Sequence, residues 1–373
     1  MPPQRSTGTT AVSLLLNTLV QPSKLRGLSE SDWDVLVRVA RASTLVSTIG
    51  TRIESAGMMS EVPTRARAQL LSERAVTDYR ARLVWWELER LVRALNPLGT
   101  PVVLLKGAAY IAQGLACAAG RTLSDVDILV PRERLPEVER ALLSCGWEAT
   151  PLEPYDDRYY RQWSHEIPPL RYGGSALELD VHHAILPPLG RVRPDPTLLM
   201  NRSIAVLPAP LRVLAPEDQV LHAALHLFQD SDCTNRLRDI VDIDALIREF
   251  CVRPSFWSDL VAHAAEYGAG RALWYALRYT RRYAATPVPE WVADQLRSHA
   301  PPPFVRKLMD ALVESALTPP DPDRGYTQTA RLASRLLLTR AAWLRFPPRL
   351  FFLHSVIKAV PWLRPAVARP QAT

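Results

Sequence analysis

Cysteine is scarce in this sequence, which has only four in 373 residues, at positions 117, 145, 233 and 251. They lie far apart, and no two form the Cys-x-x-Cys pair that marks zinc sites and redox motifs. A scaffold held together by disulfides is therefore excluded, and isolated thiols of this kind are typical of a reducing compartment. We accordingly expect a cytoplasmic protein.

Long apolar runs are missing as well. No stretch approaches the roughly 20 apolar residues that a membrane-spanning helix needs, so we do not expect an integral membrane protein. The apolar segment Ala11–Val20 is interrupted by Asn17, and no small-residue cleavage site follows it. We predict an amphipathic helix there rather than a signal peptide.

Acidic residues are absent near the C-terminus. From position 324 onward there are nine Lys and Arg and no Asp or Glu, whereas the rest of the chain has 36 basic and 38 acidic residues. The net charge of +7 is therefore a property of this tail. The simpler interpretation is a pair of terminal helices packed on the body with arginines in solvent. The alternative is a weak contact with anionic lipid or nucleic acid.

Thirty-three prolines divide the chain into segments of different periodicity. Before residue 98 the pattern predicts helices, one of them over Arg65–Leu95 and another running from a Ser31–Asp34 capping box toward Ser55. Short apolar runs then predict strands, and the helical pattern returns after Pro216. The predicted strands are Val102–Leu105, Asp125–Val130, His165–Tyr172 and Leu177–His183.

This order predicts an α+β fold, with a small mixed sheet flanked by N- and C-terminal helical regions. We place an N-terminal helical region at residues 1–98 and a sheet-containing core at 99–190. A helical domain at 191–322 and a basic helical tail at 323–373 follow.

Two aspartates stand close together on the second predicted strand. Residues i and i+2 of a strand share a face, so Asp125 and Asp127 point the same way. Carboxylates this close repel each other unless a cation lies between them, and their oxygen atoms suit Mg²⁺ or Mn²⁺. Taken alone, such a pair is more often a solvated strand end.

A third carboxylate occurs on the last predicted strand. Polar and apolar residues alternate in Leu177–His182, so Glu178, Asp180 and His182 share one face. Asp180 would complete the carboxylate set of two-metal phosphoryl transfer. The alternative is a half-exposed strand with a polar outer face.

The first predicted strand enters a helix through Lys106 and Gly107. Glycine lets a phosphate approach the backbone, and the first turn of a helix offers free N–H groups and a positive dipole. The simpler interpretation is an ordinary tight turn.

In this order, Lys106-Gly107, Arg121, Ser124–Val130 and Leu179–His182 resemble the bacterial uncharacterised nucleotidyltransferase family of the DNA polymerase beta-like superfamily. The resemblance extends over roughly residues 30–350. It implies that Asp125 and Asp127 hold metal ions that bridge a triphosphate. Asp180 would bind the catalytic metal and help to position the attacking hydroxyl.

The resemblance also implies binding roles around these carboxylates. Lys106, Gly107 and Arg121 would contact phosphates, and we place Ser124 with them. His182 and Glu178 would lie beside the metal ligands.

The function implied by this resemblance is transfer of a nucleoside monophosphate from a nucleoside triphosphate, with Mg²⁺ or Mn²⁺, to an unidentified hydroxyl-bearing acceptor. That acceptor could be a small molecule, a peptide or protein, or RNA. One alternative is a regulatory module that binds nucleotide without turnover, which Ala108 favours because a second glycine or serine usually follows the glycine in the superfamily. A glycosyltransferase ranks last, because Lys106-Gly107 and Asp180 have no place in its site.

Two other patterns have simpler interpretations. His222 and His226 are four residues apart, a spacing that can bind zinc, but their apolar neighbours favour packing. The alternating charges from Arg236 to Asp244 favour an ion-paired helix face.

Overall fold

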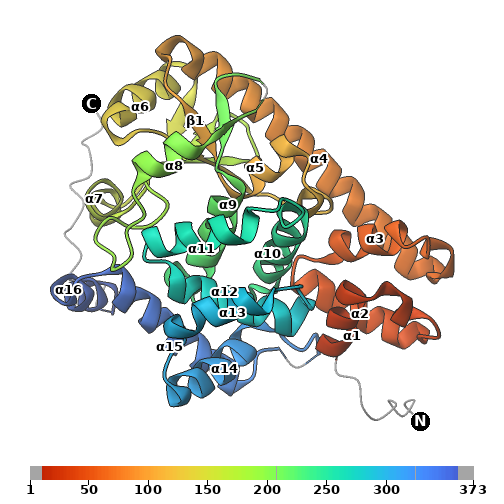
Figure 1. Cartoon of the computed structure of the whole chain (residues 1–373). Coiled ribbons are helices and arrows are strands. Elements are labelled where there is room, and N and C mark those ends of the chain that lie inside the picture. Colours follow the sequence, from red (N-terminus) through yellow and green to blue (C-terminus); the bar gives the residue numbers. More distant parts are fainter. Residues whose placement is uncertain (1–10, 207, 324, 360–373) are drawn as a thin grey trace.

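A seven-stranded mixed sheet lies at one end of the molecule, in the strand order β3-β4-β5-β2-β1-β7-β6 (Figure 1). The computed structural model describes residues 11–206, 208–323 and 325–359. The strands are β1 (Val102–Leu104), β2 (Asp125–Leu129), β3 (Trp147–Ala149), β4 (Leu170–Tyr172), β5 (Glu178–His182), β6 (Ile204–Ala205) and β7 (Leu211–Val213). The predicted α+β fold with a small mixed sheet is confirmed.

The centre of the sheet combines parallel and antiparallel pairs. β2 runs parallel to β5 and antiparallel to β1, and β1 runs parallel to β7. β6 and β7 come from beyond residue 190, so the sheet draws on chain outside the segment 99–190 that the sequence indicated as the core.

The predicted strand His165–Tyr172 was wrong in its first half. Only Leu170–Tyr172 forms a strand, β4. Pro168 and Pro169 precede it and have no backbone N–H to donate to a neighbouring strand. The segment before the prolines instead touches the end of β5 through an isolated bridge between Glu166 and His182.

Between residue 11 and the sheet lie the helices α1 (Ala11–Val20), α2 (Glu30–Ala42), α3 (Val46–Ser55) and α4 (Thr64–Leu95). α4 runs from the group formed by α1–α3 to the sheet (Figure 1), as predicted for Arg65–Leu95. The predicted capping box was wrong by two residues, because Ser29 and Asp32 form it. The helix also ends at Ala42 instead of continuing toward Ser55, since Thr44 has a positive φ of 56°.

The remaining helices surround the sheet and form the second helical region. Those between strands are α5 (Lys106–Gln113), α6 (Leu135–Ser144), α7 (Pro154–Trp163) and α8 (Pro196–Arg202). Those after the sheet are α9 (Pro216–Leu225), α10 (Leu237–Phe250), α11 (Phe256–Glu266), α12 (Gly270–Ala284), α13 (Glu290–Gln295), α14 (Pro303–Leu317), α15 (Gln328–Arg345) and α16 (Pro348–Ala359).

Short helical turns link these elements. They are η1 (Pro22–Leu25), η2 (Met59–Glu61), η3 (Asn96–Leu98), η4 (Ala116–Ala118), η5 (Arg132–Arg134), η7 (Leu296–His299) and the π-helical turn η6 (His226–Asp230).

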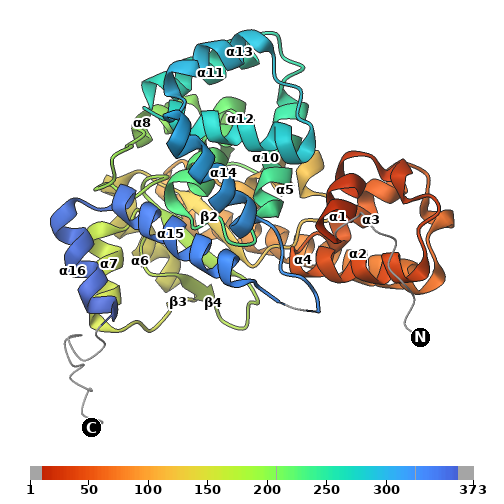
Figure 2. The same cartoon turned by 90° about the horizontal axis from the view of Figure 1, so that it is seen from below.

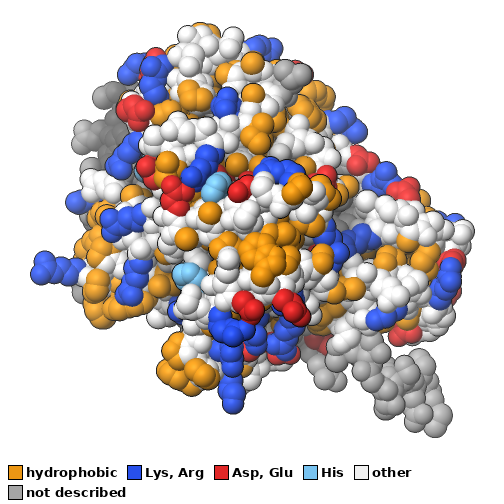
Figure 3. All heavy atoms as spheres, viewed as in Figure 1, with side chains coloured by type: hydrophobic (Ala, Val, Ile, Leu, Met, Phe, Trp, Pro, Cys, Tyr) orange, Lys and Arg blue, Asp and Glu red, His pale blue; other side chains and the backbone are white. Residues whose placement is uncertain are grey.

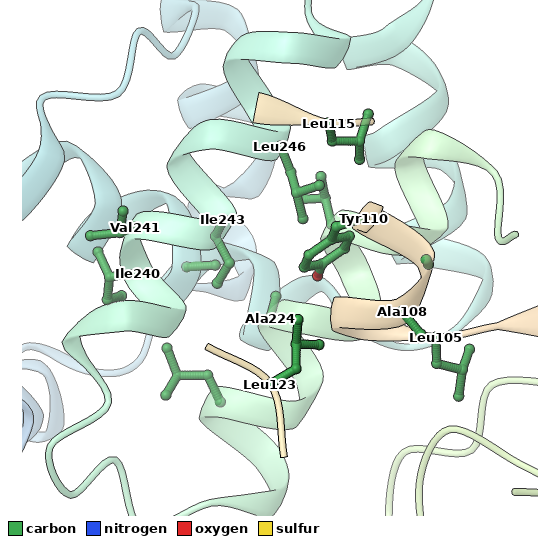
Figure 4. Packing of buried hydrophobic residues seen from close by; sticks show 14 of the residues in the cluster. Leu105, Ala108, Tyr110, Leu115, Leu123, Ala224, Ile240, Val241, Ile243 and Leu246 are labelled. Atoms are coloured by element: carbon green, nitrogen blue, oxygen red, sulfur yellow. The ribbon is translucent and has the colours of Figure 1, made fainter. Parts of the chain in front are cut away.

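Apolar packing fixes α5 against the second helical region. Tyr110 of α5 lies against Ile243 and Leu246 of α10 and near Ala224 of α9 (Figure 4). Leu105 and Ala108 belong to the same buried cluster, and all six side chains are at most 4% exposed to solvent. At about 25 cal/mol per Å² of apolar surface removed from water, such packing holds the N-terminus of α5 in place.

The basic tail is more tightly attached than the sequence indicated. α15 packs against α14 and η6, and Figure 2 shows it beside α14. Arg345 donates hydrogen bonds to the Asp230 carboxylate at 2.7–2.8 Å and to its carbonyl oxygen at 2.9 Å, and Arg340 donates to the Phe228 carbonyl. The expectation that the tail arginines lie in solvent was therefore wrong for these two, which bind partners on η6.

Other tail side chains do face solvent. Arg331, Arg335 and the apolar Leu332 are exposed on α15. Figure 3 shows apolar and basic side chains next to each other at the lower margin of the molecule, where α14 and α15 lie in Figure 1. Residues 360–373 lie outside the described part, and with them the last portion of the predicted tail. Among the residues described here, no helix has both the length and the apolar character required for crossing a membrane.

We predict that Arg345→Ala lowers the free energy of unfolding by about 2–3 kcal/mol, because it leaves the Asp230 carboxylate, whose side chain is only 11% exposed, without its cation. Arg335→Ala, on the exposed face of the same helix, should change it by less than about 0.5 kcal/mol. Urea denaturation followed by circular dichroism measures both values. Equal losses of stability in the two variants would contradict a stabilising role of the Arg345–Asp230 ion pair.

Candidate active site

The pairing of β2 with β5 brings the three predicted aspartates together. In this parallel pair Asp125 lies opposite Glu178, and Asp127 lies opposite Asp180. Carboxylate oxygens of Asp125, Asp127 and Asp180 lie within 4.8 Å of one another. Because side chains alternate along a strand, a register shifted by one residue would turn Asp180 to the opposite face of the sheet.

Asp127 is the most buried of the three, with 3% of its surface exposed. Its Oδ1 accepts a 2.7 Å hydrogen bond from Lys106 Nζ and lies 3.1 Å from His182 Nε2. Burial by itself would raise the pKa of this carboxyl, but Lys106 and His182 hold it well below its usual range. Asp127 is therefore ionised at neutral pH and joins β2 to α5 and β5.

For Asp125 and Asp180, nearby cations do not offset the effect of burial on the pKa. Burial, followed by repulsion from Asp127, raises the pKa of Asp180 to about 7 and also raises that of Asp125. Asp180 Oδ1 is buried and has no hydrogen-bond partner among the described residues. A buried carboxylate of this kind is stabilised by a cation, so the donor set fits a divalent metal with oxygen ligands.

The turn between β1 and α5 places the start of a helix beside these carboxylates. Lys106 begins α5 with a positive φ of 45°, which is uncommon for a residue with a side chain. A Cβ at Gly107 would overlap the side chains of Leu123 and Arg121. Gly107 is therefore required by the close approach of Arg121.

Ala108 points away from these groups. It is 1% exposed and packs in the apolar cluster of Figure 4, with Tyr110 and Leu105. A hydroxyl at this position would lie in the core. The small side chain at 108 therefore removes no donor from the carboxylate side of the turn.

Arg121 is held by an ion pair. Its Nε lies 2.9 Å from Asp242 Oδ2, both side chains are at most 10% exposed, and its guanidinium lies 5.5 Å from the Tyr110 ring centre. Burial opposes the charge, but Asp242 and Tyr110 raise the pKa of Arg121 further. Arg121 therefore carries its charge next to Gly107 with one partner already in place.

These groups line one cavity of about 310 Å³. Of the residues expected at the site, Lys106, Gly107, Arg121, Ser124, Asp125 and Asp127 line it. Asp180 is not among the lining residues, but its carboxylate lies within 4.8 Å of those of Asp125 and Asp127. His182 lies behind Asp127, whereas Glu178 pairs with Arg171 at 2.5 Å near the surface.

Part of this cavity was not expected from the sequence. Arg236, Arg238 and Asp239, at the start of α10, were interpreted as an ion-paired helix face, and Arg236 does lie 3.5 Å from Asp239. All three nevertheless line the cavity. Other lining residues outside the sequence-based set are Tyr110, Thr122, Ala223, His226 and Asp242. The cluster of charged residues at the start of α10 was the sequence feature that could have indicated their place in the cavity.

The histidines at 222 and 226 do not form a metal site among the residues described. His222 is buried, and burial with the nearby Lys106 charge lowers its pKa to about 3. His226 begins the π-helical turn and faces the cavity. Packing, as expected from their apolar neighbours, accounts for His222.

An α+β core with a mixed sheet and three convergent carboxylates is the architecture of a nucleotidyltransferase. The chain belongs to the family described as uncharacterised nucleotidyltransferase, whose profile matches residues 29–285. The family expected from the sequence motifs is thus confirmed. Neither the curated proteins nor the solved structures contain a significant match to the chain.

We predict that Gly107→Ala weakens nucleotide binding at least tenfold, because the added methyl group displaces Arg121 and Leu123. Overpacking of this kind also costs about 1–3 kcal/mol of stability. Gly173→Ala is the control, since a Cβ there meets no atom within 4 Å. Fluorescent-nucleotide titration and thermal unfolding measure the two effects, and unaltered binding in Gly107→Ala would contradict the packing argument.

We also predict that Mn²⁺ affinity rises with pH up to about 7. The raised pKa of Asp180, about 7 in the metal-free protein, means that a proton must leave before metal binds below that value. The dissociation constant should fall up to about tenfold per pH unit between pH 5.5 and 7 and level off above. Isothermal titration of wild type and Asp180→Asn checks this, because the variant should lose most of the slope.

Proposed function

We propose that the protein transfers a nucleoside monophosphate from a nucleoside triphosphate to a hydroxyl group of an acceptor, releasing pyrophosphate. The observation that carries this proposal is the convergence of Asp125, Asp127 and Asp180 beside the Lys106-Gly107 turn. The order of these motifs supports a place in the DNA polymerase beta-like superfamily. The acceptor is a small molecule, a peptide or protein, or RNA.

Asp125, Asp127 and Asp180 would hold Mg²⁺ or Mn²⁺, for which their oxygen atoms are suitable ligands. Such an ion supplies positive charge to the triphosphate during transfer. The partnerless Asp180 oxygen and the raised pKa of Asp125 and Asp180 support this assignment.

Basic groups on the cavity wall support triphosphate binding. Lys106, Arg236 and Arg238 line the cavity from two sides, and Arg121 lies beside Gly107. The first turn of α5 adds backbone N–H groups and the positive end of the helix dipole. Ser124 contributes a hydroxyl at the start of β2.

In the reaction, the acceptor oxygen forms a bond to the α-phosphorus as the bond to the bridging oxygen of the β-phosphate breaks. Asp180 would orient the acceptor hydroxyl and accept its proton on a carboxylate oxygen. Pyrophosphate leaves with the electron pair of the broken bond. Positioning and electrostatic stabilisation account for most of the rate enhancement in this class of reaction.

The alternative is a module that binds nucleotide without turnover. Ala108 was the sequence feature that favoured it. Because Ala108 packs in the core and not against the cavity, it offers no support for loss of activity. Transfer is therefore the function that the geometry supports best.

The test uses the four nucleoside triphosphates, each labelled at the α-phosphate, with Mg²⁺ or Mn²⁺ and fractionated cell lysate as the source of acceptor. Label should appear in a metabolite, protein or RNA fraction. We predict that Asp125→Asn lowers transfer at least 1000-fold (about 4 kcal/mol) without unfolding the protein.

Asp125 is the sharper target, because replacing Asp127 would leave Lys106 and His182 without their shared partner. The control is Asp294→Asn, an exposed carboxylate on α13. Nucleotide binding without label transfer, in wild type as in Asp125→Asn, would favour the regulatory module instead.

A further inference from the structure

A second group of metal-ligating side chains lies directly behind the three aspartates. It consists of His165, Glu166 and His182, whose nearest donor atoms all lie within 4.8 Å of one another. His182 Nε2 is 3.4 Å from Glu166 Oε2, and the rings of His165 and His182 are 5.1 Å apart between centres. None of the proposed steps of transfer uses His165 or Glu166.

The backbone holds this group in place. His183 N–H donates a 2.8 Å hydrogen bond to the His165 carbonyl, and Ile167 N–H donates one of 3.1 Å to the Val181 carbonyl. These bonds flank the bridge between Glu166 and His182. The loop that carries two of the donors is therefore fixed to the strand that carries the third.

The two imidazoles have unused nitrogen atoms. Nδ1 of His165 and Nδ1 of His182 are buried, and neither has a hydrogen-bond partner among the described residues. His182 is 2% exposed. A buried polar atom left without a partner costs free energy, and a ligand that accepts its lone pair removes that cost. Glu166, with 21% of its side chain exposed, opens the group to solvent.

We propose that His165, Glu166 and His182 bind a divalent transition metal ion, of which Zn²⁺ is the representative. Two imidazoles and one carboxylate favour first-row transition metals over Mg²⁺, which prefers oxygen ligands. At metal–ligand bonds of about 2.0–2.2 Å and tetrahedral angles, two donors stand roughly 3.3–3.6 Å apart, so side-chain rotations that draw these donors together by about 1 Å complete the site. Three protein ligands are the number found where a coordination position stays open to water or substrate.

This site is distinct in chemistry from the one formed by the three aspartates. Asp127 holds His182 through Nε2 and belongs to the oxygen-only group. The transition metal would therefore take the partnerless Nδ1 of His182, since a metal-bound imidazole is commonly held by a carboxylate through its other nitrogen. The protein would thus hold a nitrogen-containing centre next to an oxygen centre, with different metals preferred in each. The inference does not depend on nucleotidyl transfer.

The test measures Zn²⁺ bound to the full-length, chelator-treated protein by equilibrium dialysis and elemental analysis. No nucleotide is present, and excess Mg²⁺ fills the aspartate group. Wild type should bind one equivalent of Zn²⁺. His165→Ala and Glu166→Gln should each weaken that binding at least tenfold, and the near-isosteric Glu166→Gln keeps the test valid if the histidine variant fails to fold.

Two variants serve as controls. His183 lies next to His182 but lines a different cavity with Arg132 and Pro188, so His183→Gln should bind Zn²⁺ as wild type does. Asp125→Asn should do the same, because it changes only the oxygen group. Displacement of Zn²⁺ by Mg²⁺, or equal binding in wild type, His165→Ala and Glu166→Gln, would overturn the proposal. Loss in Asp125→Asn alone would assign the zinc to the aspartates and overturn it as well.

Discussion

The rest of the site depends on one set of contacts, those that the ionised carboxylate of Asp127 makes with Lys106 and His182. This carboxylate is buried on β2, and it is bound by Lys106 from the first residue of α5 and by His182 from the end of β5. A charge in such a place is tolerated only while its partners stay close. The same contacts therefore set the positions of the turn, the two strands and the imidazole at once, before any substrate enters.

Around this fixed charge, the protein leaves other charges unbalanced. Asp125 and Asp180 lie close to Asp127, and burial together with repulsion from Asp127 raises the pKa of both. The cavity lining also carries Arg236, Arg238 and Arg121, of which Arg121 is paired with Asp242. Carboxylates that favour a metal ion and cations that favour phosphate therefore line the same cavity. Both kinds of group are expected of a site for a metal–triphosphate complex.

The sequence predicted the parts of this arrangement that follow from local periodicity. The positions of the three aspartates on their strands follow from the two-residue repeat, and the long helix α4 follows from its apolar stripe. Strands of two or three residues, such as β6 and β7, carry too little pattern to be detected. The contact of Arg345 with Asp230 joins residues 115 positions apart, and no local rule reports such a pair. Whether the charges at the start of α10 faced solvent or a cavity was equally hidden, because it depends on how α10 packs against α5.

The close packing of Arg121 against Gly107 has a consequence for how this family varies. The space that a side chain at 107 would need is filled by the guanidinium and by Leu123. A relative with a bulkier residue at position 107 would need a shorter or redirected side chain at position 121. The carboxylate at position 242, which pairs with that side chain, would have to change as well. These three positions should therefore diverge as a unit, and their covariation among homologues would record a steric contact rather than a shared role in chemistry.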